Sequence, residues 1–443
     1  MVRHIMIDKD KKQEEYYKNY TYRDNIPVYV DKITEEHQKK LIDSKVFCIL
    51  PWIHIHGFPN GQAYPCCLAE SDYPVGNFHT NSMKEVWNSD NYKQLRYNMM
   101  NEIPSKECSK CYEREQSGFI SMRNDSNKNF GQHLNLLEKT KPDGYVEEFK
   151  IRYYDIRFSN LCNMSCRTCG SWFSSSWYNE EVKLYGARNH PQFMYAGKDK
   201  DDMWNQMQEH IPYLEQIYFA GGEPLIMEEH YRVLKELVRL KRFDVRLIYN
   251  TNFSKLMLKD ENVLDYWKLF KSVSVGASLD GMGARGEYIR KGTKWDDIVR
   301  NREQMMKVCP EVDFYISSTV SIFNAFHIPD FHKEWVERGL IKPQDWNINI
   351  LQGPPQYRLD VLPKDYKEKL RERILQHIFW VAPKDNLKRA TGGFKGILNY
   401  MEQNDNSKDL ALFFKQTDLL DSSRSECFED VFPEYKDLRS YVT

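Results

Sequence analysis

The chain has 443 residues, a length that predicts two or three domains. Its 63 lysine and arginine residues balance 64 aspartate and glutamate residues, so overall charge excludes a protein that binds nucleic acid or an acidic membrane through a strong net field. The mean hydropathy is -0.70, and no stretch approaches the roughly 18 consecutive apolar residues of a spanning helix. Because the first residues also lack the apolar segment of a secretion signal, we expect a soluble cytoplasmic protein without a membrane partner.

The chain begins with a charged, tyrosine-rich stretch over residues 1–45. This stretch lacks a clear hydrophobic period and is expected to be an N-terminal extension. Residues 46–120 carry five cysteines and are expected to form a small cysteine-rich α+β domain. A polar segment over residues 121–147 follows, and its composition is typical of a linker.

A β-hairpin is predicted near the start of the cysteine-rich domain. The sequence WIHIHGF alternates between apolar and polar side chains, and a Pro-Asn-Gly turn follows it. The alternation places His54 and His56 on one face, which we expect to be solvated. Two short helices follow, the second capped by Ser89 or Asp90.

From Glu148 onward, β-type runs alternate with helical runs. The expected strands are 150–158, 216–220, 243–250, 272–279, 312–320 and 346–351. The expected helices between them are 173–185, 228–241, 261–270, 295–308 and 329–338. Because parallel neighbouring strands need a crossover, six such strands indicate an α/β fold with a parallel sheet over residues 148–355. A helix near 364–380 and a polar tail make residues 356–443 an expected C-terminal helical region.

Three cysteines follow the first predicted strand at close spacing. Cys162, Cys166 and Cys169 form a C-x3-C-x2-C pattern at the carboxyl end of a parallel strand, where α/β folds build their sites. Thiolates this close can bind three irons of a cubane iron–sulfur cluster, and they leave the fourth iron open to another ligand. Three structural cysteines, or a zinc site completed by a remote histidine, remain alternatives.

A glycine-rich turn follows the second predicted strand. Its residues are Gly221, Gly222, Glu223 and Pro224. Glycines let the backbone approach a ligand closely, and the Glu223 carboxylate can accept hydrogen bonds from an ammonium group. An ordinary turn between a strand and a helix is the alternative.

A second set of cysteines lies before the predicted sheet. Cys48 and Cys66 fit a C-x12-G-x4-C pattern, and Cys108 and Cys111 follow as a C-x2-C pair. Four thiolates complete the coordination of a metal without solvent or substrate, which suits a structural or electron-transfer site, and both zinc and an iron–sulfur cluster fit. Cys67 is an alternative to Cys66, although only Cys66 satisfies the spacing from the glycine and neighbours in a strand point to opposite faces.

The three-cysteine loop and the Gly-Gly-Glu-Pro turn together resemble the radical S-adenosylmethionine (SAM) superfamily over residues 150–352. The resemblance implies a partial (β/α)6 TIM-like barrel and a [4Fe-4S] cluster bound by Cys162, Cys166 and Cys169. It implies that SAM binds the open iron through its amino and carboxylate groups, with residues 221–224 near the amino group. One electron, from a partner such as flavodoxin or ferredoxin, would then cleave SAM to methionine and a 5′-deoxyadenosyl radical that takes a hydrogen atom from the substrate.

Further polar residues match segments that lie near SAM in this superfamily. Ser278 and Asp280 in the sequence SLDG follow the fourth strand, and Arg290 carries a guanidinium suited to a carboxylate. Asn252, after the third strand, could line the same opening, although each of these residues also suits an ordinary turn or a solvated surface. One residue departs from the pattern: Thr168 stands where many members have an aromatic residue, so a packing contact to the adenine is expected from elsewhere.

The four-cysteine pattern resembles the SPASM/twitch module of radical SAM enzymes, and its single ligand set fits the smaller twitch form. By this resemblance, Cys48, Cys66, Cys108 and Cys111 bind an auxiliary [4Fe-4S] cluster. In the superfamily this module normally follows the barrel, whereas here it precedes the barrel. The way in which it docks therefore does not transfer.

The resemblance implies an enzyme of the oxidoreductase or peptide-modifying type. The auxiliary cluster would take an electron from the substrate radical or help to hold the pocket, and the substrate would be a peptide or protein side chain or a small molecule that is oxidised or cross-linked. Candidate walls of the substrate site are Tyr153, Trp172, Trp177 and residues 346–357, although aromatic residues at such positions are often core. His327 is a candidate proton relay.

Two other functions remain open. The chain could be a non-catalytic binding or regulatory protein with a degenerate barrel and a structural zinc, although all seven candidate ligand cysteines are present. It could also be a radical SAM enzyme that modifies nucleic acid. The neutral charge does not favour a nucleic-acid partner, but a local patch would suffice for a small RNA.

Overall fold

The computed structural model describes residues 34–116 and 120–442, so most of the predicted N-terminal extension lies outside the described residues. The chain divides into two compact units. The first contains the residues up to Leu161 with 189–248 and 269–273, and the second contains 162–188, 249–268 and the residues from Ser274 onward. The boundaries predicted at residues 120 and 147 do not coincide with this division, because each unit combines separate stretches of chain.

The first unit contains the cysteine-rich hairpin and the first strands of the α/β region. The helices described in it are α2 (Glu35–His37), α3 (Met83–Trp87), α4 (Asp90–Met100), α5 (Ser109–Gln116), α6 (Met122–Phe130), α8 (Asp202–Met207) and α9 (Glu228–Arg239). Its strands are β1 (His54–Gly57), β2 (Gln62–Tyr64), β3 (Gly76–Asn77), β4 (Tyr153–Ile156) and β6 (Gln216–Phe219), and β7 (Arg246–Thr251) runs from this unit into the second. The predicted cap is confirmed, because the Ser89 side chain accepts a hydrogen bond from the N–H of Tyr92 at the start of α4.

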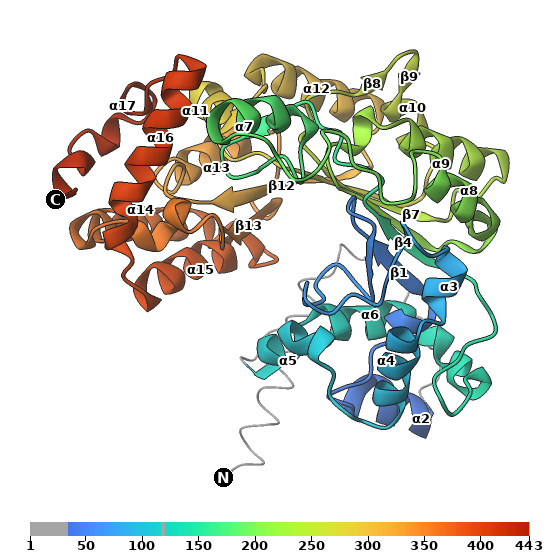
Figure 1. Ribbon diagram of the computed structural model, residues 1–443. Coiled ribbons are helices and arrows are strands. Elements are labelled where there is room, and N and C mark those ends of the chain that lie inside the picture. The colour runs from blue at the N-terminus through green and yellow to red at the C-terminus, as the bar shows by residue number, and fades with distance from the viewer. Residues whose placement is uncertain (1–33, 117–119, 443) are drawn as a thin grey trace, which may run out of the picture. The chain divides into compact units, whose positions relative to one another are not determined.

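Parallel pairing joins the hairpin to the α/β region. β1 pairs parallel with β4, with His54 opposite Tyr153, and β4 pairs parallel with β6. The predicted hairpin is confirmed, because β1 also pairs antiparallel with β2, which in turn pairs with β3. The strand order in this unit is therefore β6-β4-β1-β2-β3, in which β1 is an inner strand (Figure 1).

The expectation that His54 and His56 are solvated is wrong. Both side chains are fully buried, because β1 lies between β2 and β4. His54 stacks on Tyr153 with ring centroids 4.3 Å apart, and burial lowers the pKa of His54 to about 4. The Nδ1 atom of His56 lies 3.1 Å from the carboxylate of Asp155, which also pairs with Arg157 at 2.8 Å.

The segment 121–147, predicted as a linker, contains packed structure that begins with α6. The Asn127 side chain of this helix is buried. It accepts a hydrogen bond from the N–H of Ile49 and donates one to the carbonyl of Phe47, each at 2.9 Å. The segment looked like a linker because it is polar. One of its polar side chains, Asn127, instead forms hydrogen bonds with buried backbone groups on either side of Cys48.

The second unit contains the later strands and the C-terminal helices. The helices described in it are α7 (Tyr178–Tyr185), α10 (Val263–Trp267), α11 (Gly283–Ile289), α12 (Trp295–Val308), α13 (Ile328–Glu337), α14 (Lys364–Val381), α15 (Arg389–Gln403), α16 (Leu410–Arg424) and α17 (Phe428–Val431). Its strands are β5 (Ser165–Cys166), β8 (Met257–Leu258), β9 (Glu261–Asn262), β10 (Val273–Ala277), β11 (Arg290–Lys291), β12 (Asp313–Val320) and β13 (Trp346–Ile350).

Parallel strands also organise the second unit. β10 pairs parallel with β12, and β12 pairs parallel with β13. α15 packs on β13, and α14 packs on α15 (Figure 1). Three helices follow α14 in the region expected to be helical with a polar tail. All six predicted strands are present, as β4, β6, β7, β10, β12 and β13, and a helix follows each of them. The predicted α/β class with parallel strands is confirmed.

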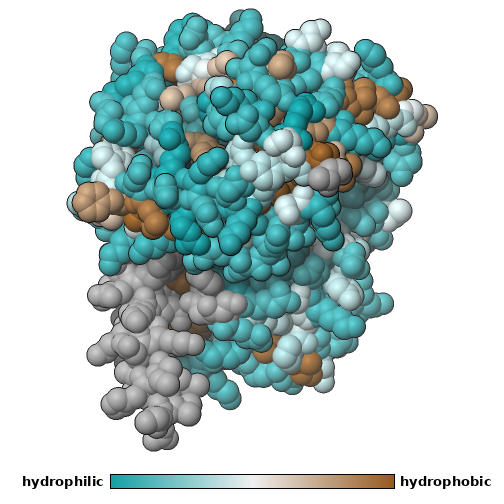
Figure 2. Space-filling model, turned by 90° about the vertical axis from the view of Figure 1, so that its left-hand side faces the viewer, coloured by the Kyte–Doolittle hydropathy of each residue, from teal (hydrophilic) through white to brown (hydrophobic). Residues whose placement is uncertain are grey.

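The surface is predominantly polar where Figure 2 shows it, with hydrophobic residues in small separate groups. Scattered apolar residues of this kind are normal on folded proteins. Among the helices in the described part of the chain, none combines the length and the apolar character needed to cross a bilayer.

We expect Arg157→Gln to destabilise the chain strongly. Burial alone would raise the pKa of Asp155, but Arg157 and His56 lower it well below its usual value, so the variant leaves a buried carboxylate without its main cation. Removing one partner of a buried ion pair costs about 3–5 kcal/mol. Urea denaturation at pH 7 should show a loss of this size in the free energy of unfolding.

The matched control is Arg239→Gln, which removes an exposed pair with Glu236 within α9. Exposed pairs of this kind contribute less than about 1 kcal/mol. Equal losses for the two variants would contradict the importance assigned to the Asp155 pair.

Candidate metal centres

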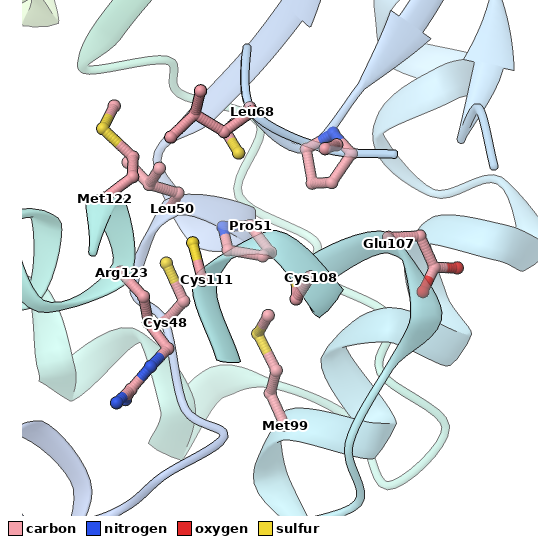
Figure 3. A pocket seen from close by; sticks show the side chains of 13 residues that line it. Cys48, Leu50, Pro51, Leu68, Met99, Glu107, Cys108, Cys111, Met122 and Arg123 are labelled. Atoms are coloured by element: carbon pink, nitrogen blue, oxygen red, sulfur yellow. The ribbon is translucent and has the colours of Figure 1, made fainter. Parts of the chain in front are cut away.

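Four cysteines of the first unit line one pocket (Figure 3). They are Cys48 before the hairpin, Cys66 after β2, and Cys108 and Cys111 around the start of α5. Figure 3 labels Cys48, Cys108 and Cys111. The rest of the lining is mainly apolar and includes Leu50, Pro51, Leu68, Met99 and Met122. The two halves of the predicted ligand set, which lie far apart in the sequence, therefore come together as expected.

Burial keeps the thiols of this pocket protonated when no metal is bound. It raises the pKa of Cys48 to about 12, and it also raises the pKa values of Cys66 and Cys108. Repulsion between neighbouring thiolates raises these pKa values further, because the groups are close to one another. Metals bind the thiolate form of cysteine. The positive charge of a metal centre would offset the free-energy cost of ionising these buried, mutually repelling thiols.

Within the described residues, no three His, Cys, Asp or Glu side chains converge tightly enough to hold a single metal ion. Two observations support a metal group in the four-cysteine pocket. All four cysteines line the same pocket, and their thiolates are close enough to repel one another. Thiolates are the usual ligands of a cubane iron–sulfur cluster, which is larger than a single ion. The donor set therefore suits such a cluster.

The structure distinguishes Cys66 from Cys67. Cys66 lines the pocket with the other three cysteines. The Cys67 thiol instead lies near Asp155 and Arg157, and burial together with the Asp155 charge raises its pKa well above the usual value. The geometry therefore favours Cys66 as the fourth member of the set, as its spacing indicated.

The glycine of the C-x12-G-x4-C pattern has a structural role in the hairpin. Gly61 has a φ of +82°, in the left-handed region that favours glycine. A Cβ at this position would also lie 2.6 Å from the side chains of Asn77 and His79. Any other residue would strain the turn that leads into β2 and Cys66.

Arg123 is a pocket residue that the sequence pattern did not indicate. It lines the four-cysteine pocket from α6, and its guanidinium donates to Glu115 and to the carbonyls of Ser44 and Phe47 at 2.9–3.0 Å. Its charge lowers the pKa of Cys48, although burial outweighs this effect. A cation placed here would help to balance the negative charge of a thiolate-bound cluster.

The three-cysteine loop opens the second unit. The N–H of Cys169 and the indole N–H of Trp177 both donate to the carbonyl of Cys166, at 2.9 and 2.8 Å. The N–H of Cys162 donates to the Ser175 hydroxyl at 3.3 Å. Burial raises the pKa values of Cys166 and Cys169, the latter to about 12, and the Cys166 charge adds to the shift at Cys169. These two thiols therefore lie close together, as a shared cluster requires.

Arg290 lies against this loop. β11 pairs antiparallel with β5, with Arg290 opposite Cys166, and an Arg290 Nη1 atom lies 3.8 Å from the Cys166 sulfur. The guanidinium pairs with Asp280 at 2.8 Å, and the other oxygen of Asp280 accepts the N–H of Thr319 at 2.8 Å. Asp280 was expected to lie near SAM, and within the protein its two oxygens contact Arg290 and the N–H of Thr319. These contacts allow Asp280 to orient the Arg290 guanidinium.

The Gly-Gly-Glu-Pro turn belongs to the first unit and follows β6. The N–H of Glu223 donates to the carbonyl of Leu161 at 2.8 Å, immediately before Cys162 in the chain. A Cβ on Gly222 would lie 2.1 Å from the same carbonyl oxygen, so this close approach of two backbones requires glycine. The Glu223 carboxylate is buried and accepts the N–H of Leu225 at 3.0 Å.

Asn252 lies beside the three-cysteine loop. Its amide donates to the side chain of Asn163, which lies within the loop, at 2.8 Å. Its oxygen accepts from the N–H and the hydroxyl of Ser254. The N–H of Ser278 donates to the carbonyl of Thr251 at 2.7 Å, so the residue after β10 is hydrogen-bonded to the last residue of β7.

Three of the candidate substrate walls are core residues. Tyr153, which stacks on His54, Trp177 and Trp346 are buried, whereas Trp172 is 39% exposed. His327 is buried and accepts a hydrogen bond from the N–H of Met282 at 3.2 Å. Burial lowers the pKa of His327 to about 3, so its surroundings hold it neutral and do not favour a proton relay.

The polar residues of β10 and β12 were not singled out from the sequence, whereas those of β13 lie within the candidate wall at residues 346–357. The Ser274 hydroxyl donates to Asp313 at 2.9 Å, and the Asn349 amide donates to the Ser317 hydroxyl at 3.1 Å. Tyr315 lies between Asp313 and Ser317 at the same alternating positions of β12. The signal was present as alternation in DFYISSTV and WNINI, but alternation does not reveal whether a polar face meets solvent or a binding site.

Comparison with known proteins bears most directly on the four cysteines of the pocket. The SPASM family model, described as an iron–sulfur cluster-binding domain, matches residues 48–112, a range that begins at Cys48 and includes Cys66, Cys108 and Cys111. No curated protein sequence is significantly similar to the chain.

Two solved structures illustrate the distant similarities. Native anSMEcpe with bound AdoMet is 20% identical over 50% of this chain and 60% of that chain, with a TM-score of 0.34. Streptococcus suis SuiB bound to S-adenosylmethionine is 12% identical over 66% of this chain and 62% of that chain, with a TM-score of 0.33. This chain spans about three fifths of the length of these two structures, and likeness at this level does not carry an argument about function. The family match, in contrast, confirms the prediction of a SPASM-type iron–sulfur cluster-binding module over residues 48–112.

Proposed function

We propose that the chain is a radical SAM enzyme with a SAM-binding [4Fe-4S] cluster in the three-cysteine loop and an auxiliary [4Fe-4S] cluster in the four-cysteine pocket. The observation that carries the proposal is the contrast between the two sets of thiols. The pocket supplies a complete set of four, whereas the loop supplies three, and the charged side chain against Cys166 is Arg290, which cannot ligate iron. A three-thiol set suits a cluster with one iron open to a small molecule.

When the cluster and SAM are bound, a single electron cleaves SAM and generates a radical that removes a hydrogen atom from the substrate. The residues of the chain would hold and orient these groups. Within the second unit, Arg290, held by Asp280, carries a guanidinium suited to the SAM carboxylate. A flavodoxin or ferredoxin is the proposed electron donor.

The polar face of β10, β12 and β13 supports a polar substrate. Asp313, Ser317 and Asn349 offer hydrogen-bonding groups along neighbouring strands, which a peptide or a polar small molecule could use. Loss of a hydrogen atom, followed by loss of one proton and one electron, would oxidise the substrate by two electrons or join two of its atoms. We propose the auxiliary cluster as the acceptor of that electron.

Cleavage of SAM is the central test. Anaerobically reconstituted protein, incubated with SAM and dithionite, should form 5′-deoxyadenosine. Cys166→Ala should reduce this product to the level seen without protein, because the cluster loses one of three ligands. Chromatography of the quenched reaction measures the product.

The matched control for this test is Cys309→Ala, which removes a buried cysteine outside both candidate sites and should leave product formation unchanged. Wild-type protein that binds iron but forms no 5′-deoxyadenosine would contradict the proposal.

Iron content tests the auxiliary site. Two cubane clusters correspond to about eight irons per chain. Cys66→Ala should retain about four irons, whereas Cys67→Ala should retain about eight, because only Cys66 lines the pocket. Elemental analysis after reconstitution and desalting measures both.

The opposite pattern would assign the ligand role to Cys67. Zinc without iron in the wild-type protein would instead support the non-catalytic binding or regulatory protein.

A further inference from the structure

The last residue of α16 contacts the three-cysteine loop within the second unit. Arg424 forms two hydrogen bonds with Glu180, at 2.9 and 2.8 Å, and its side chain is only 3% exposed. The same guanidinium donates to the carbonyl of Ser165 at 2.9 Å and lies over the ring of Trp177. Because Trp177 itself donates to the carbonyl of Cys166, both peptide carbonyls that flank the Cys166 side chain are held by this group of residues.

A second contact between the loop and the C-terminal region runs through Arg167, the residue after Cys166. Its fully buried guanidinium donates to Asp421 of α16 and, at 2.7 Å, to Glu426. It also lies 3.6 Å from the centre of the Tyr288 ring, and the Tyr288 hydroxyl donates to Asp421 at 2.8 Å. A side chain of the loop is thus enclosed between α11 and α16.

The charges of these contacts balance. The ion pairs are Arg424 with Glu180, Arg167 with Asp421 and Glu426, and Lys291 with Glu426. A balanced set adds little net field at the cysteines, in contrast to Arg290, whose cation contacts the Cys166 sulfur. Its effect on the loop is therefore one of position.

We infer that the C-terminal end of α16 is part of the SAM-cluster site, with Arg424 and Arg167 as positioning residues that hold the loop in its metal-binding conformation. This inference rests on the proposed function, because it takes the three cysteines of the loop as cluster ligands. A loop that is already ordered loses less conformational entropy when it binds a metal group. Partners that orient metal ligands typically contribute roughly 10–100-fold to metal affinity.

The test compares full-length variants of the reconstituted protein. Arg424→Gln removes the charge and the bonds to Glu180, while Arg424→Lys keeps the charge and one donor for the Ser165 carbonyl. Iron loss to a ferrous chelator should show two phases of about four irons each. In Arg424→Gln, the phase assigned to the loop should be roughly 10–100-fold faster than in wild type. Arg424→Lys should fall between the two, and the phase from the auxiliary cluster should not change.

The matched control is Arg439→Gln. Arg439 also pairs with two carboxylates of the C-terminal region, Asp418 and Glu429, but the contacts described for it do not reach the loop. Its iron loss should match wild type. A second readout is the electron paramagnetic resonance spectrum of the reduced protein. Added SAM should alter the loop-cluster signal in wild type, and the SAM concentration needed should rise in Arg424→Gln.

The outcomes separate the two proposals. If wild-type protein holds a SAM-responsive cluster and Arg424→Gln loses it no faster, the role of α16 is overturned and the proposed function stands. If wild-type protein holds no SAM-responsive cluster, both are overturned. Should Arg424→Gln fail to fold, Arg424→Lys decides alone: faster loss of the loop cluster supports the inference, and an unchanged rate overturns it.

Discussion

The parallel pairing of β1 with β4 is the interaction on which the first unit depends. It makes the first strand of a hairpin an inner strand of the sheet, and so it buries His54 and His56. Cys48 precedes this strand and Cys66 follows its partner in the hairpin, so the position of β1 in the sheet constrains two of the four pocket thiols. β4 leads to Ser159 and Leu161, whose carbonyls accept hydrogen bonds from the N–H groups of Gly222 and Glu223.

Features that depend on neighbouring residues could be predicted from the sequence. The helix expected over 295–308 is present with those bounds, and Ser89 caps the second short helix, because hydrophobic spacing and capping are local properties. The four-cysteine pocket was also predictable, since its pattern and spacing are those of a shared metal site. The SPASM match over residues 48–112 agrees with that prediction.

Features that depend on distant segments could not be predicted. His54 is buried because β1 pairs with β4, where its contact residue Tyr153 lies 99 positions further along the sequence. Arg167 and Asp421, which form an ion pair, are 254 positions apart. A single sequence does not specify such partners. The partners of Asp280 were missed for a related reason: its motif did not show that its oxygens pair with Arg290 and accept a backbone N–H from β12.

The outermost strand of the sheet in the first unit, β3, is only two residues long. A long exposed edge strand presents a row of unpaired N–H and C=O groups that another chain can extend, and short edge strands limit such pairing. β2, the next strand inward, has only three residues. β1 covers one edge of β4, and the short β2 and β3 then end the sheet on that side, so the hairpin leaves little free edge there for strand addition by another chain.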